Sequence, residues 1–246
     1  MSININNYIN SFEFDFTLPG SNEIIMFKPL TTGQLKKLLP YENEKNPEII
    51  ESLLDNLISN CVVSEGFDIN TLYLQDRFAL LVEIRKKSKG ETYEFIYDCP
   101  ECNNKKNITL DLNELSVKKK DYDTKTFIFN DKLSFELDGI TRGDQIMAAK
   151  MVNKLKIKNE NLKQAEIATY MFAMSMKTFH TPEGDTKDVP MEAKINLIDN
   201  IMNDEQYNRF TNHFTENDFG VDFKFDFGCD CGKTEKFVIP MNNFFI

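Results

Sequence analysis

The chain has 246 residues, of which 41% are apolar and 28% are charged, and its formal net charge is −10. This composition is typical of a folded globular protein with room for one large core or two modest ones, and not of a disordered chain. The acidic balance argues against a nucleic-acid-binding surface, which needs concentrated positive charge. The apolar runs are too short to cross a bilayer, so we expect no stable membrane insertion.

The beginning of the chain and the cysteine content indicate a reducing compartment. Residues 1–14 contain neither a basic segment nor an uninterrupted apolar core, so we expect no secretory signal. Five cysteines in a cytosolic setting indicate metal ligands or buried thiols before disulfides. Residues 3–9 are a candidate segment for becoming ordered on a partner.

The first part of the chain is predicted to form a hairpin followed by helices. Residues 12–18 alternate between apolar and polar side chains, and residues 23–29 form a second run after a Pro-Gly turn, which predicts two strands. Thr31 or Thr32 can cap a short helix that precedes Pro40. Further helices are predicted from Pro47 to Cys61 and from Leu74 to Lys87. Cys61 lies on an apolar helix face without a partner at ligand spacing, so we predict a buried free thiol.

Two distant segments repeat one pattern of strand, cysteine pair, polar turn and return strand. The first consists of residues 92–112 and the second of residues 219–240. Two cysteine pairs at the tips of two hairpins can face each other and complete a tetrahedral zinc site, as in a zinc ribbon. Such a site has no open position for water, so its zinc is structural. The predicted ligands of one zinc ion per chain are Cys99, Cys102, Cys229 and Cys231.

The surroundings of these cysteines both support and weaken the zinc prediction. Gly228 and Gly232 permit positive φ angles in the second turn, and Lys105 and Lys233 can offset part of the thiolate charge. The second pair is one residue short of the commonest spacing and lies far from the first. A long insertion is tolerable because loop-closure entropy grows only logarithmically. A redox motif and a set of free thiols stay open, although a redox Cys-x-x-Cys would open a helix and this one joins two strands.

The middle of the chain differs from the two ends in its predicted secondary structure. It is predicted to contain a hairpin with a turn at Asn130-Asp131, then helices, with a loop at residues 180–190. We call each hairpin turn with its cysteine pair a knuckle. The fold class is therefore α+β, with β-hairpins closing a zinc-ribbon-like two-knuckle unit and an inserted, mainly helical subdomain. The helices are expected at 141–156, 161–178, 190–201 and 203–215. The expected divisions are 1–116, with the first knuckle; 117–218, the hairpin and helical insertion; and 219–246, the second knuckle, packed on the first part.

The sequence contains no recognisable catalytic motif. His180 and His213 are predicted to be surface or capping residues, and glycine-rich phosphate-binding motifs are absent from the sequence. We therefore predict no enzyme, while a hydrolase whose site no motif reveals stays open. Two groups can either fill the core or contact a partner: the C-terminal residues 244–246 and the methionines of the predicted helices, Met147, Met151 and Met171 among them.

Two stretches resemble a known family. Residues 30–39 read LTTGQLKKLL, and residues 72–102 read LYLQDRFALLVEIRKKSKGETYEFIYDCPEC. Over residues 20–115, with a consistent second knuckle, the chain resembles the baseplate proteins of T4-like contractile-tailed phages, whose members are hub components or hub-assembly factors. The resemblance implies structural roles for Asp76 and Arg85, for instance as a helix-side ion pair, while ordinary charge on a helix surface stays open as the alternative for both. The helical part of the pattern is carried by Tyr73, Asp76, Leu80, Leu81, Ile84 and Arg85.

The resemblance implies a non-enzymatic structural or assembly subunit of a phage tail baseplate, in its hub region. Its partners would be other baseplate or tail proteins, with room for several copies per particle and no direct contact with nucleic acid. It would be found in the host cytoplasm during assembly and then in the virion tail. The alternative is a zinc-ribbon adaptor that binds nucleic acid or a transcription or replication complex, against which the charge of −10 counts.

Overall fold

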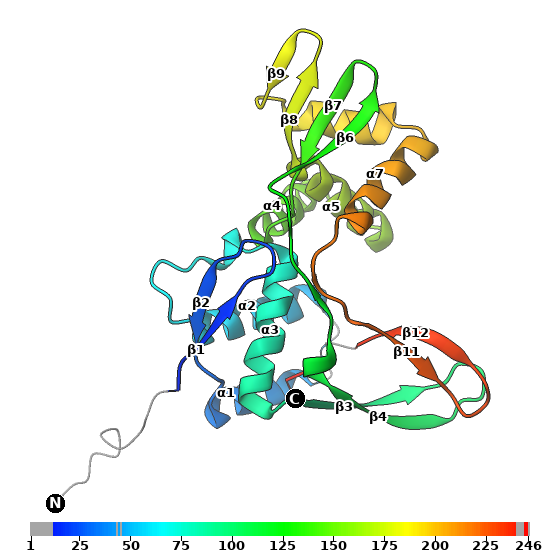
Figure 1. Ribbon diagram of the computed structural model, residues 1–246. Helices are drawn as coiled ribbons and strands as arrows, with labels where there is room; N and C mark the ends of the chain where they lie inside the picture. The colour runs from blue at the N-terminus through cyan, green and yellow to red at the C-terminus, as the bar shows by residue number, and fades with distance from the viewer. Residues whose placement is uncertain (1–11, 43, 45, 240–243, 246) are drawn as a thin grey trace, which may run out of the picture.

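The computed structural model describes residues 12–42, 44, 46–239 and 244–245. Helices and small antiparallel sheets alternate along these residues, in agreement with the predicted α+β class. Figure 1 shows two regions, one built from the middle of the chain and the other from the parts that precede and follow it. Within the described residues, no helix combines the length and the apolar character that spanning a membrane requires.

The predicted hairpin and helices of the first part are confirmed. Strand β1 (Phe14–Thr17) pairs antiparallel with β2 (Ile24–Phe27), so that Phe14 lies opposite Phe27. Thr31 begins the first helix with a capping box, because its side chain and that of Gln34 each accept a hydrogen bond from the other's backbone N–H. The helices of this part are α1 (Thr32–Leu38), α2 (Pro47–Cys61) and α3 (Leu74–Lys89), with short 3-10 turns at Leu39–Tyr41 and Ile69–Thr71.

Helix α3 is buried along much of its length, and its charged residues do not pair as expected. The Asp76 carboxylate accepts hydrogen bonds from the backbone N–H groups of Gly20 and Ser21, in the turn of the first hairpin. Arg85 donates instead to backbone carbonyl oxygens near the other end of the helix. The predicted ion pair between Asp76 and Arg85 is therefore wrong. Each side chain binds backbone from another part of the chain, which sequence spacing alone does not reveal.

The two cysteine-bearing segments form separate hairpins. In the first, β3 (Thr92–Asp98) pairs with β4 (Lys105–Asp111), and in the second, β11 (Lys224–Gly228) pairs with β12 (Thr234–Val238). The continuous strand predicted at residues 219–228 is interrupted. Its first part, β10 (Gly220–Val221), pairs with β5 (Val117–Lys118). A 3-10 turn at Leu112–Glu114 precedes β5 in the chain. The interruption has a local cause, because the Asp222 side chain accepts a hydrogen bond from the backbone N–H of Lys224.

The middle of the chain contains more strand than predicted. The hairpin of β6 (Lys125–Asn130) and β7 (Leu133–Leu137) is extended by β8 (Met176–Thr181) and β9 (Gly184–Thr186) into one four-stranded sheet. Residues 176–178, predicted as the end of a helix, and residues 180–181 and 184–186, predicted as loop, lie in these strands, so the predictions are wrong there and the loop prediction holds for the rest of 180–190. Pairing of β8 with β7 draws this segment into the sheet. The helices are α4 (Arg142–Asn153), α5 (Glu160–Ser175), α6 (Met191–Asn196), continued by a π-helical turn at Leu197–Ile201, and α7 (Asp204–Glu216).

Two hydrophobic clusters correspond to the two regions. The first combines β1, β2, α2 and α3 with residues from the end of the chain, including the buried rings of Phe244 and Phe245. These two residues therefore fill the core, which was one of the two alternatives for the C-terminal segment; Ile246 and residues 3–9 lie outside the described residues. The second cluster is rich in phenylalanine and is made chiefly of Phe127, Phe129, Phe135, Phe179, Phe210, Leu137, Leu197 and Ile198.

Candidate functional site

The two cysteine turns have closely related backbone structures. In the first, the Cys99 N–H donates to the carbonyl of Asn104 at 3.0 Å, and Cys99 O accepts from the N–H of Asn103 at 2.9 Å. In the second, the Cys229 N–H donates to the carbonyl of Lys233 at 2.7 Å, and Cys229 O accepts from Gly232 at 2.9 Å. The second turn is thus one residue tighter, which matches its shorter cysteine spacing.

Each turn also places a residue with positive φ directly after its second cysteine. Asn103 has φ of 56° and Gly232 has φ of 92°, a region that glycine and asparagine occupy more readily than other residues. Gly228, by contrast, lies within β11 and is not among the described residues with positive φ. The expectation for Gly228 was therefore wrong, and the one for Gly232 is confirmed.

The turns bring four sulfur atoms together. The Cys99 and Cys231 sulfurs are 3.8 Å apart, and those of Cys102 and Cys229 are 3.7 Å apart, so each close pair joins one hairpin to the other. All four sulfurs lie within 4.8 Å of one another. Zinc–thiolate bonds of about 2.3 Å at tetrahedral angles separate sulfurs by about 3.8 Å, whereas a disulfide needs about 2.05 Å. The spacing and the donor set fit a tetrathiolate metal site.

The electrostatics of the cluster favour the thiolate form of Cys99 over those of Cys102 and Cys229. Backbone N–H groups, chiefly that of Cys102, lower the pKa of the Cys99 thiol to about 7. The Asn104 N–H has the same effect at Cys102, but desolvation and the neighbouring thiols outweigh it and raise the Cys102 pKa to about 12. The pKa of Cys229 is also raised. Four thiolates at these distances repel one another, so full ionisation requires a bound cation.

Apolar side chains cover one side of the cluster and charged side chains the other. Tyr97 and Cys99 are buried against Ile108 and Phe225. Phe225 also contacts the ring of Phe95 with centroids 6.1 Å apart, which joins the two hairpins beside the cluster. On the outer side, ion pairs join the turns: Lys233 to Glu101 at 3.2 Å and Lys106 to Asp230 at 3.1 Å. Lys105 instead pairs with Asp98 of its own hairpin at 3.4 Å.

Cys61 lies apart from this cluster. It is a buried free thiol at the end of α2, as predicted, and desolvation raises its pKa to about 11. A thiol with this pKa stays protonated at neutral pH and behaves as a small apolar side chain.

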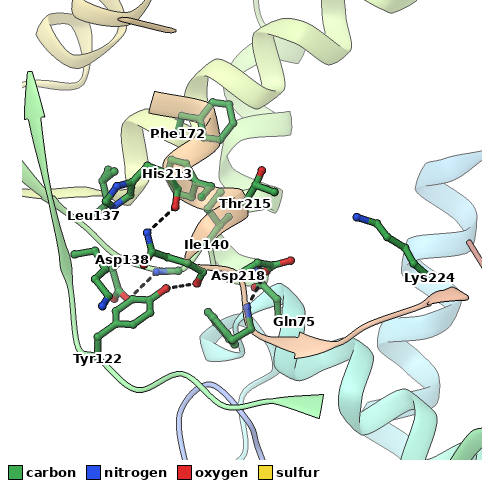
Figure 2. Close-up of a pocket in the computed structure, with 15 residues that line it drawn as sticks. Gln75, Tyr122, Leu137, Asp138, Ile140, Phe172, His213, Thr215, Asp218 and Lys224 are labelled. Carbon is green, nitrogen blue, oxygen red and sulfur yellow. Dashed lines mark hydrogen bonds between the residues drawn. The ribbon is translucent and has the colours of Figure 1, made fainter. Parts of the chain in front are cut away.

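A second polar centre lies where the two regions meet, and no sequence motif indicates it. The Lys120 Nζ donates to Asp138 Oδ1 at 2.6 Å and to the Tyr73 hydroxyl at 3.1 Å, and it lies 4.5 Å from the centre of the Tyr73 ring. Asp138 belongs to the cavity drawn in Figure 2, which also includes His213 and Gln75. These residues come from distant segments, so no local motif could identify them.

The two histidines differ from each other in the structure. His180 lies on β8 with its Nδ1 atom 2.8 Å from the Asp185 carboxylate, near the surface. His213 is half-buried, with its ring edge-on to that of Phe127. Its Nε2 atom is buried and has no hydrogen-bond partner among the described residues. The expectation of a surface position was therefore wrong for His213, because the polar helix α7 packs this residue against the four-stranded sheet.

A buried ion network also connects the two regions. Asp55 of α2 accepts hydrogen bonds from Arg77 of α3 at 2.8 Å and from Arg142, at the start of α4, at 2.6 Å. Glu51 adds contacts of 2.9 Å to Arg77 and 3.4 Å to Arg142. Both guanidinium groups are almost completely removed from solvent, so this network helps to fix the middle region on the first part.

Comparison with known proteins identifies a family. The family described as T4 bacteriophage base plate protein matches residues 10–246. The match confirms the resemblance found in residues 20–115 and extends it through the middle region and the second cysteine turn. No curated protein and no solved structure matches the chain.

Proposed function

The chain belongs to the T4 bacteriophage base plate protein family, and from this we propose that it is a structural or assembly subunit in the hub region of a phage tail baseplate. The family match carries the proposal, because it spans both cysteine hairpins and the region between them. Such a subunit is non-enzymatic and acts by binding neighbouring tail proteins. It would occur in the host cytoplasm during assembly and afterwards in the virion tail.

A structural zinc ion is the second part of the proposal. The ligands would be Cys99, Cys102, Cys229 and Cys231, whose sulfurs lie within 4.8 Å of one another. With four thiolates the ion has no open coordination position, so it contributes stability to the fold and no catalysis. Its effect would be specific, because β3–β4 and β11–β12 are separate two-stranded sheets with no strand pairing between them among the described residues. The ion would hold the two hairpins together.

Charge supports protein partners in place of nucleic acid. A net charge of −10 disfavours the phosphate backbone, and the lysines beside the cysteine cluster are paired with carboxylates. The zinc-ribbon adaptor is therefore the less supported function. Retention of the purified protein on duplex DNA at physiological salt would favour the adaptor.

The hub proposal is tested by locating the protein during infection. Tails and tail-assembly intermediates are purified from infected cells, and their protein content is quantified by mass spectrometry. We expect the protein in hub-containing intermediates. Its presence in finished tails as well would identify a structural subunit, and its loss from them an assembly factor. Absence from both fractions, or normal hub assembly after deletion of the gene, would overturn the proposal.

A further inference from the structure

Two cavities adjoin each other where the two regions of the protein meet. One has a volume of about 350 Å³ and the other of about 500 Å³. They share four lining residues, so we treat them as one elongated junction groove that passes along β10. The shared residues are Thr215, Asp218, Phe219 and Lys224.

The junction groove contains two buried polar atoms that lack partners. Gln75 donates through Nε2 to Asp218 at 3.1 Å, a contact visible in Figure 2, but its Oε1 atom has no hydrogen-bond partner among the described residues. The same is true of His213 Nε2 on the neighbouring wall. Buried polar groups in folded proteins are normally satisfied, so Gln75 Oε1 points to a bound molecule that supplies an N–H or O–H group, while His213 Nε2 can donate or accept according to the ring tautomer.

The charged side chains around the junction groove differ in whether they have interaction partners. Asp138 is neutralised by Lys120, whereas Asp218 and Asp222 keep their charge and accept hydrogen bonds from neutral groups of the chain, namely the Gln75 amide and backbone N–H groups. Lys125 and Lys224, in contrast, have no carboxylate partner among the described residues. Lys125 lies 4.6 Å from the centre of the Tyr122 ring, and Figure 2 shows Lys224 extending toward the other labelled residues. Among the described residues that line the groove, the charged side-chain groups without a hydrogen-bonding partner are therefore those of two lysines, in a protein that is acidic as a whole.

Part of the wall of the junction groove is apolar. Aromatic side chains of Phe172, Phe214 and Phe219 line the first cavity, and Val238 lines the second while remaining 59% exposed. An elongated site with apolar walls, unpaired polar atoms and two lysines without carboxylate partners among the described residues suits an extended polypeptide better than a compact metabolite.

We propose that the junction groove binds an extended, acidic polypeptide segment of a neighbouring tail protein. A backbone N–H of that segment donates to Gln75 Oε1, a carboxylate pairs with Lys125 and Lys224, and apolar side chains lie on the phenylalanine wall. The inference rests on the proposed baseplate role, since that role supplies the protein partner.

The test places the photo-crosslinking amino acid p-benzoylphenylalanine at position 215 of the full-length protein in infected cells. Irradiation is expected to give an adduct with one tail protein, and mass spectrometry should map it to one short acidic segment. The control places the same amino acid at position 183, an exposed residue in the turn between β8 and β9, where no such adduct is expected.

Charge variants identify the recognition chemistry. Lys125→Glu combined with Lys224→Glu should lower the adduct yield about tenfold or more, because like charges replace the proposed ion pairs. Lys132→Glu, at an exposed lysine outside the junction groove, should leave the yield unchanged, as should Lys224→Arg. Gln75→Leu should lower the yield while the melting temperature stays near that of the wild type.

Each contrary outcome is distinct from failure of the hub proposal. If the gene is required for hub assembly but position 215 gives no adduct, or gives one only with residues 1–11 of its own chain, the partner-binding inference is overturned alone. An adduct whose yield does not change in the charge variants would overturn the inference that the bound segment is acidic. If the protein is absent from assembly intermediates, the hub proposal itself fails.

Discussion

The guanidinium of Arg85 donates a hydrogen bond through Nε to the carbonyl oxygen of Phe244 at 2.7 Å, which ties the end of the described chain to helix α3. The same guanidinium donates to the carbonyls of Gly90 at 2.8 Å and Thr92 at 3.0 Å. The Phe244 ring packs edge-on against that of Tyr93 with centroids 5.1 Å apart. A buried cation and an aromatic core therefore hold the C-terminal segment in place, and this segment is part of the fold.

Phe244→Ala should lower the free energy of unfolding by about 3–5 kcal/mol, the usual cost of truncating a buried phenylalanine. Deleting residues 241–246 should cost more, because it also removes Phe245 and leaves Arg85 without one of its acceptors. Both effects can be measured by urea denaturation. Phe12→Ala is the control: this side chain is 70% exposed, so its loss should change stability by less than about 0.5 kcal/mol. A deletion variant as stable as the full chain would contradict the core assignment.

Metal content provides the next prediction. The purified protein should contain about one zinc ion per chain, as a single tetrathiolate site requires. Cys231→Ser should reduce bound zinc strongly without disturbing the core, because Cys231 is the exposed member of the cluster. Plasma mass spectrometry and the absorption spectrum of the cobalt-substituted protein give the measurements.

Cys61→Ser is the matched control for the metal prediction. It changes a buried cysteine outside the cluster, so it should lower stability modestly and leave the zinc content unchanged. Protein that contains no thiophilic metal when prepared under reducing conditions would falsify the tetrathiolate assignment. Equal zinc content in wild type and Cys231→Ser would show that another group holds the ion.

The elements that could be predicted from the sequence are those specified locally. Alternation in residues 12–18 and the cap at Thr31 act within a few neighbouring residues, so the hairpin and α1 could be read directly. The clustering of the four cysteines could be predicted because a tetrahedral site needs four donors and the chain offers two pairs of cysteines. Strand β8 could not, because its place is set by pairing of Phe179 with Phe135, far away in sequence. The same holds for Asp76 and for His213, whose environments are built by distant segments.

The division of the chain at about residues 117 and 218 remains a proposal, and the Asp55 network gives a way to probe it. Asp55→Ala should cost about 3–5 kcal/mol, because it leaves the buried guanidinium groups of Arg77 and Arg142 without their main partner. Circular dichroism and urea denaturation would measure the loss. If the network joins two separately packed regions, the variant should also show unfolding in two steps.

Another ion pair between the same regions provides the control. Glu48 of α2 lies 3.6 Å from Lys163 of α5, and the Glu48 side chain is 72% exposed. Glu48→Ala should therefore change stability by no more than about 0.5 kcal/mol, since water screens the pair. Similar losses in both variants would mean that burial of the Asp55 network contributes nothing special.

His213 predicts a dependence of stability on pH. Desolvation lowers its pKa below the ordinary value of about 6.5, an effect that Glu216 opposes and Lys125 reinforces. The unfolded chain then binds more protons than the folded one between the lowered pKa and about 6.5, so the free energy of unfolding rises with pH across that window. The contribution is complete above about pH 6.5 and is lost as the pH falls toward the folded-state pKa.

His213→Gln should therefore flatten the dependence of the melting temperature on pH relative to the wild type. All other side chains are the same in both proteins, so the difference between the two curves isolates the contribution of His213. An NMR titration of the His213 ring should give a midpoint below 6.5. A midpoint at or above that value, or parallel melting curves for the two proteins, would show that burial does not control this histidine.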